Sequence, residues 1–149
     1  MALPTEIDFA LIKRGDGADP EVFVVLCGLT DVTYNESVQK SDRYVRDCAK
    51  PGEVPLRRNK VTGKSLDIGG SGLTNAANIP TLNTAMGRIE NYRVELYADN
   101  GTDTGNLLGT VAGAFLLASN SMNLTRDGDG TSDISLASDG AYTYTAAGA

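Results

Sequence analysis

Few residues in this chain have side chains that could carry out catalysis. The sequence contains no histidine, which excludes Ser-His-Asp and Cys-His nucleophilic systems and imidazole metal sites. The two cysteines, Cys27 and Cys48, lack the partners of a zinc site. The acidic residues form no recognisable cleft motif, although the sequence leaves a carboxylate dyad open. We therefore predict a protein that is not an enzyme and that needs no metal or cofactor.

Two segments share part of the pattern of a ligand-binding loop. Residues 127–133, DGDGTSD, begin like a calcium loop, but the EF-hand pattern needs glycine at position 6 and an acid at position 12, where this chain has Ser132 and Ser138. Residues 69–72, GGSG, precede a predicted helix but lack the Gly-Lys-Ser/Thr ending of a P-loop. We interpret the first segment as a hairpin turn and the second as a flexible corner between a strand and the helix.

The most unusual distribution of charge lies in residues 39–64, QKSDRYVRDCAKPGEVPLRRNKVTGK, termed the arm from here on. The arm holds 8 of the 13 basic residues and three acids, so its net charge is +5 in a chain of net charge -6. Complementary charges steer and orient encounters between proteins. The arm therefore predicts contact between copies of this chain. Its basic residues are Lys40, Arg43, Arg46, Lys50, Arg57, Arg58, Lys60 and Lys64.

Prolines and apolar residues are mixed with the charges of the arm. Pro51 and Pro55 lack a backbone donor, so we expect the middle of the arm not to be regular central sheet. A solvated, mobile loop is the usual meaning of a charge run, and the sequence leaves this alternative open. Four apolar side chains weigh against it, because they would have no packing partner on a free loop and suggest a contact surface; they are Tyr44, Val45, Val54 and Leu56.

Hydrophobic periodicity predicts mainly β structure. Residues 6–13, 32–34 and 92–98 alternate between apolar and polar, and in 6–13 we expect Ile7, Phe9 and Leu11 on the buried face. Residues 21–27 are nearly all apolar, which predicts a strand covered on both faces with Cys27 buried. The apolar phase changes within residues 107–125, which indicates a bulge or a bend near residues 119–121. The apolar spacing of residues 78–90 predicts one helix, capped by Asn78.

These elements predict a single domain over residues 1–149. We count eight or nine strands, including two final strands around residues 134–136 and 142–144, joined mainly by tight Gly and Asp turns. The expected fold is an antiparallel β-sandwich or a partly closed barrel with one flanking helix and a long arm between strands. Residues 145–149 are expected to form a flexible tail.

Composition and charge narrow the classes of protein. The isoelectric point near 4.5 argues against a protein that wraps duplex DNA, because neutralising phosphates requires an excess of Lys and Arg. The N-terminus, MALPTEIDFALIKRGDG, does not have the pattern of a signal peptide. No apolar run reaches the roughly 20 residues that span a bilayer. We expect a protein made and folded in a cytoplasm, without a membrane partner.

The order of features along the chain adds a resemblance. A first hairpin leads into Gly28-Leu-Thr-Asp-Val-Thr and the arm, followed by LDIGGSGLTN (66–75), one helix, NYRVELYADNG (91–101) and a final Asp139-Gly-Ala-Tyr-Thr-Tyr. In this order the features resemble the major tail tube proteins of long-tailed bacteriophages and of phage-derived gene transfer agents. The chain departs from the family near the third strand, where Thr33-Tyr34-Asn35 replaces a frequent Thr-Asn or Thr-Ser pair.

The resemblance implies a fold, an assembly and a set of partners. The family has a β-sandwich with a flanking helix, similar to the tube protein of type VI secretion, and its subunits form hexameric rings that stack into a hollow tube for DNA ejection. The arm would reach the neighbouring ring and contact it through its basic residues and Tyr44. The implied partners are other copies of the chain and tail proteins such as the tape measure, terminator and distal tail proteins. DNA would pass without specific binding. The implied location is the virion, after assembly in the cytoplasm of a bacterial host.

An acidic chain also suits such a lumen. Like charge repels the phosphates of DNA, so a polar and acidic lining would let DNA pass without sticking. The residues that we predict to line the lumen are Glu95, Ser119, Ser121, Asn123, Thr125, Thr131, Asp133 and Ser135.

Two other functions stay open at this point. A tail terminator or a head–tail connector of a virion has a similar composition, but it should stop at one ring, whereas a tube protein should form long filaments. A β-sandwich binding module, for instance for carbohydrate, usually presents aromatic platforms, and this chain has no Trp.

Overall fold

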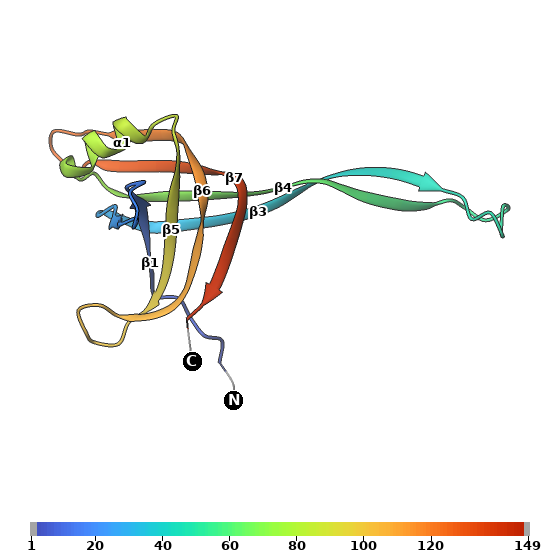
Figure 1. Ribbon diagram of the computed structural model, residues 1–149, viewed down its shortest axis with the longest axis horizontal. Helices are drawn as coiled ribbons and strands as arrows, with labels where there is room; N and C mark the ends of the chain where they lie inside the picture. Colours follow the sequence, from blue (N-terminus) through green and yellow to red (C-terminus); the bar gives the residue numbers. More distant parts are fainter. Residues whose placement is uncertain (1–2, 148–149) are drawn as a thin grey trace.

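The computed structural model describes residues 3–147 as one antiparallel β-sheet with a short helix and a long projecting hairpin (Figure 1). Within these residues there are seven strands: β1 (Phe9–Gly15), β2 (Phe23–Val25), β3 (Leu29–Val45), β4 (Leu56–Leu73), β5 (Ile89–Ala98), β6 (Asn106–Asn123) and β7 (Thr131–Ala146). A 3-10 turn, η1 (Ala76–Asn78), leads into the helix α1 (Ile79–Ala85).

The sheet has the strand order β2-β1-β5-β6-β7-β4-β3, and all neighbours are antiparallel. It curves around its own core, but β2 and β3 at its two ends do not pair, so the barrel is not closed. This arrangement confirms the predicted fold class of a mainly β, partly closed antiparallel structure with one helix and a long arm. The strand count is lower than predicted because the two final strands are one, β7, which bends at Gly140, where φ is +85°.

The core lies on the inner face of the curved sheet. Tyr92 and Phe115 meet edge to face, with ring centroids 6.4 Å apart, and both are almost fully buried. The buried position of β1 is Ile12, opposite Val94. The predicted phase of β1 was therefore wrong: Phe9 points to the other face, where its ring stacks on Tyr97 with centroids 5.0 Å apart. A stacked aromatic pair can stabilise the outer face of a sheet as well as its core. The position of Phe9 in the alternation therefore did not identify the core side.

The predicted flexible corner at residues 69–72 was also wrong, since these residues lie inside β4. Their glycines permit close packing rather than bending. A Cβ atom on Gly72 would lie 2.0 Å from the carbonyl oxygen of Gly28, and one on Gly70 would lie 2.7 Å from Cδ1 of Ile12. Small residues are thus required where β4 passes close to the start of β3 and to β1.

The helix is shorter than the predicted range 78–90. Asn75, rather than Asn78, caps the first turn by accepting a hydrogen bond from the Ala77 amide at 3.1 Å. The Asn78 side chain instead donates to the Cys27 carbonyl at 2.7 Å. Gly87, with φ at +77°, follows the helix, and the chain then enters β5. A residue in this left-handed conformation ends a helix readily, which the apolar spacing alone did not reveal.

Two further predictions differ from the structure. Cys27 is exposed, not buried, because the adjacent β2 is a three-residue edge strand with one open face. Thr145 and Ala146, predicted to belong to a flexible tail, pair with Thr110 and Gly109 of β6. The last two residues of the predicted tail, 148–149, lie outside the described residues.

Candidate functional site

A continuous polar surface covers the outer side of four adjacent strands. Residues paired across antiparallel strands point to the same side of a sheet, so the register determines the members of this surface. Ser71 of β4 pairs with Asp31 of β3 and with Asp133 of β7, and Asp133 pairs with Ser121 of β6. The polar face comprises Asp31, Thr33, Asn35, Asp67, Gly69, Ser71, Thr131, Asp133, Ser135, Ser119, Ser121 and Asn123.

The same strands place apolar residues on the opposite, inner side. Leu66, Ile68, Ile134 and Leu136 alternate with the polar residues and are almost fully buried. In β6 the buried position Leu117 pairs with Leu136, and the next pair is Ser119 with Ser135, so Ala118 is an extra residue. Because of this extra residue, the odd-numbered side chains of β6 change from the inner to the outer side of the sheet, so Ser119, Ser121 and Asn123 point outward. The predicted phase change in this segment is confirmed, just before the predicted position.

The polar face is small in side-chain size and acidic in charge. Its twelve positions include three carboxylates, from Asp31, Asp67 and Asp133, and neither Lys nor Arg. Such a surface creates a potential that repels polyanions. Its large apolar neighbour is Leu73, which pairs with Thr131 at the end of the face and is exposed; the twelve positions themselves carry small or polar side chains. Its composition therefore suits a surface past which an anionic polymer moves without binding.

Six of the eight residues predicted to line a lumen lie together on the polar face, and two do not. Thr125 lies in the turn after β6, where its hydroxyl faces the Asp129 carbonyl at 3.4 Å. Glu95 lies on β5 and is only 8% exposed. Five polar members of β3 and β4 were missed, although the alternation of Asp31, Thr33 and Asn35 around Val32 and Tyr34 was a usable signal.

Glu95 belongs to an ion pair rather than to the polar face. Its carboxylate lies 3.0 Å from Nζ of Lys13 and accepts a hydrogen bond from the Tyr97 hydroxyl. Burial raises the pKa of Glu95, but the hydrogen bonds from Tyr97 and Lys13 outweigh it and hold that pKa below its ordinary value. The hydrogen bond to Glu95 is in turn the main cause that raises the pKa of Tyr97 from 10.0 to about 12.

This coupling predicts a pH dependence of stability. Because the folded state raises the pKa of Tyr97, its contribution is complete below pH 10 and is lost as the pH rises towards about 12. Tyr97→Phe should therefore lower the free energy of unfolding near neutral pH and weaken its decline between pH 10 and about 12. Urea unfolding across this range measures the effect, with Tyr44→Phe as the exposed control. If the free energy of unfolding fell equally steeply with pH in the wild type and in Tyr97→Phe, the coupling would be contradicted.

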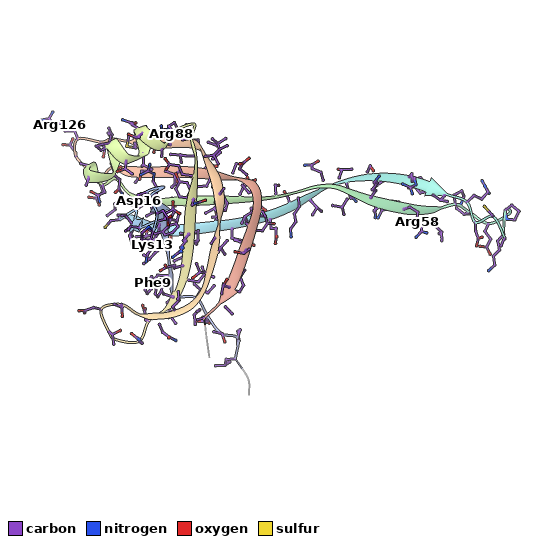
Figure 2. The ribbon with its side chains drawn as sticks, viewed as in Figure 1. Phe9, Lys13, Asp16, Arg58, Arg88 and Arg126 are labelled. Carbon is purple, nitrogen blue, oxygen red and sulfur yellow. The ribbon has the colours of Figure 1, made fainter. Side chains whose placement is uncertain are left out.

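The arm is a regular β-hairpin that extends far beyond the body (Figure 1). Residues 40–45 of β3 pair with residues 56–61 of β4, and only the tip around Pro51 and Pro55 is irregular, as the prolines predicted. The side chains of the arm point away from the hairpin on both sides along its length, with Arg58 near its outer part (Figure 2). The hairpin differs from the alternative of an unstructured loop.

Two of the predicted contact residues stabilise the arm itself. The guanidinium of Arg46 donates to the carbonyls of Pro51 and Glu53 at 2.8 and 3.0 Å, which closes the tip. At the base, Nζ of Lys64 lies 3.6 Å from the Glu36 carboxylate and 5.3 Å from the centre of the Tyr142 ring. Tyr142 also donates a hydrogen bond to Glu36. This cluster ties the base of the arm to β7.

Other features of the described residues do not add a site with chemistry. One cavity of about 550 Å³ opens on the inner face and is lined mainly by apolar residues such as Ala10, Val32 and Leu96. Residues 3–147 contain no cluster of three or more His, Cys, Asp or Glu residues that could hold a metal ion. In the same range, no helix is long and apolar enough to cross a membrane.

The chain has structural neighbours among tail and tube proteins. No protein-family model and no curated protein matches it in sequence. A chain in the tail of an empty gene transfer agent particle has a TM-score of 0.62 and 19% identity, covering 91% of this chain and 95% of that one. The sheath/tube terminator of the extracellular contractile injection system PVC has a TM-score of 0.64 and 13% identity, covering 98% of this chain and 99% of that one. The SPP1 tail tube has a TM-score of 0.57 and 12% identity, covering 93% of this chain and 76% of that one. At these identities the likeness concerns the fold, and the chain has the fold found in these tails and tubes.

Proposed function

We propose that this chain is the structural subunit of a phage-type tail tube, in which rings of subunits stack around a lumen that DNA crosses during ejection. The observation that carries the proposal is the polar face: twelve positions on four strands, acidic and without a basic residue, on a subunit with the tail-tube fold. In a ring, this face lines the lumen. Its carboxylates repel DNA phosphates and its small polar side chains leave DNA free to slide.

The same comparison supports a number of copies in each ring. The gene transfer agent tail has C6 symmetry, which supports hexameric rings for this chain. Pairing the free strands at the two ends of the sheet with neighbouring copies would remove exposed edges. The other partners are a tape measure protein inside the tube, and terminator and distal tail proteins at its ends. The tube is part of a virion and is assembled in the host cytoplasm, and the subunit has no catalytic role.

A tail terminator is the second candidate function. The likeness to the PVC sheath/tube terminator, with a TM-score of 0.64, favours it as much as the fold of the tail subunits favours a tube. The two functions differ in what limits assembly. A tube subunit offers compatible surfaces on both sides of its ring and keeps growing, whereas a terminator offers only one.

Electron microscopy of the purified protein separates the two functions. Concentrated protein in negative stain should show long filaments with a central channel and a regular axial repeat. Single rings that do not stack at any concentration would favour the terminator. A protein that stays monomeric at every concentration would contradict both functions. Mass measurement of isolated rings then tests the proposed number of six copies.

A further inference from the structure

The two faces of the arm differ in charge, and only the strand register reveals this difference. Ser41 pairs with Lys60, Arg43 with Arg58, and Val45 with Leu56. These six residues form one face, termed the cationic face, with three cations and no carboxylate. The intervening pairs form the mixed face, with two cations and one carboxylate: Lys40 with Val61, Asp42 with Asn59, and Tyr44 with Arg57. Arg57 and Arg58, adjacent in sequence, therefore lie on opposite faces.

The cationic face carries charge that the chain itself does not neutralise. Arg43 and Arg58 lie directly opposite each other, and like charges in this position destabilise a strand pair. Within residues 3–147, the ion pairs of the arm join Lys40 to Asp42, Lys50 to Glu53 and Lys64 to Glu36, and none involves a cation of the cationic face. Beside the two arginines, Val45 and Leu56 are exposed, Leu56 by 74%. An acidic surface with an apolar patch would satisfy both features.

The body of the chain has a surface of this composition at the corner between β1 and β2. Residues 16–24 contain Asp16, Asp19 and Glu21 and no basic residue. Val22 and Val24 next to them are 57% and 61% exposed. The outer edge of β2 is also unpaired, because β2 is the last strand of the sheet. Asp16 accepts hydrogen bonds from the Ala18 and Val22 amides, and Glu21 accepts from Gly17 and Asn91 on the side where Arg93 covers the Phe23 ring. Beside the valines, the corner thus offers the negative charges of Asp16 and Asp19, an apolar pair and a free strand edge.

The positions of the two surfaces decide the kind of contact. Asp16 lies on the side of the body away from the arm, and Arg58 lies far out on the arm (Figure 2). The arm cannot fold back onto its own corner as a straight hairpin, so its contact is with a second copy. A contact between two different surfaces of one chain is heterologous and builds rings or filaments rather than closed pairs.

We propose that the cationic face of the arm, and not the mixed face, packs on the β1–β2 corner of a second copy. Arg43, Arg58 and Lys60 meet the carboxylates of the corner, and the Val45–Leu56 pair covers Val22 and Val24. This inference rests on the proposed function for the identity of the assembly, but the contact itself does not require a tube.

Photocrosslinking at adjacent positions tests the contact directly. A benzoylphenylalanine placed at Val45 reports the cationic face, and one at Tyr44 reports the mixed face. In concentrated protein, the probe at 45 should crosslink to residues 16–24 of a second copy, as mapped by mass spectrometry, and the probe at 44 should not. Crosslinks to the corner from 44 alone, or from neither position, would overturn the inference. Crosslinking also detects contacts in small oligomers. A chain that makes no tubes would therefore contradict the proposed function, whereas its crosslinks would still test the contact.

Charge reversal of two neighbouring arginines provides a matched pair of variants. Arg58→Glu should raise the concentration needed for association by at least about tenfold, whereas Arg57→Glu should change it little. The two variants have the same composition and net charge, so a general effect of charge would act on both equally. Adding Asp19→Lys to Arg58→Glu should restore part of the association. Equal effects of the two single variants, or a complete lack of rescue, would contradict the inference. If Arg58→Glu lost binding to duplex DNA but associated normally, a nucleic acid would be the partner instead.

Discussion

Removal of the arm is expected to abolish tube formation while leaving the body folded. Replacing residues 39–63 by Asn-Gly would join Val38 to Lys64, which already pair in the sheet, through a two-residue hairpin turn. No residue of the hydrophobic core comes from the removed segment. The melting temperature and circular dichroism of the shortened protein should therefore match the wild type. Negative-stain images should show no filaments, because the proposed contact of the arm with a neighbouring copy would be missing.

Mixing provides the control for this experiment. The shortened chain retains the β1–β2 corner, so in the proposed contact it would accept an arm but offer none. Added to wild-type protein in small amounts, it should shorten the filaments in proportion to its fraction. A shortened chain that formed normal tubes alone would show that the arm is not required for stacking. A shortened chain with a lowered melting temperature would instead assign the arm a role in folding.

Charge reversal on the polar face is expected to slow DNA ejection strongly without preventing tube assembly. Asp31→Lys with Asp133→Lys changes this part of the face from two negative to two positive charges per copy, on strands that flank Ser71. In a lumen formed by many copies, these lysines would bind phosphates along the passing duplex, with an affinity that falls steeply as salt increases. The variant particles should assemble tails of normal length and release DNA slowly at low salt.

A variant with the same change of net charge elsewhere controls for this effect. Asp103→Lys with Asp127→Lys alters two exposed turns outside the polar face. Ejection by these particles should equal that of the wild type, as measured by the release of fluorescently stained DNA. The delay in the Asp31 and Asp133 variant should disappear at high salt, because screening weakens phosphate contacts. Unchanged ejection at low salt would exclude the polar face as the lumen lining.

Much of this protein follows from properties that are local in the sequence. Alternation of apolar and polar residues has a period of two in a strand, so the mainly β fold and the polar segments around Ser121 and Asp133 could be predicted without a structure. The reversal of phase before Ser119 was visible for the same reason. The clustering of basic residues in the arm and the break at its prolines are likewise properties of consecutive residues.

The tertiary structure decided the relations between segments that are distant in the sequence. Glu95 reads as an exposed acid in its own strand, but the neighbouring β1 brings Lys13 to its carboxylate and removes it from the polar face. Cys27 reads as a core residue, but β2 stands at the edge of the sheet, where one side has no neighbour. Strand order and register depend on how loops close and cores pack, which residue types along a single strand do not encode. For the same reason, only the pairing of Arg43 with Arg58 separates the two faces of the arm.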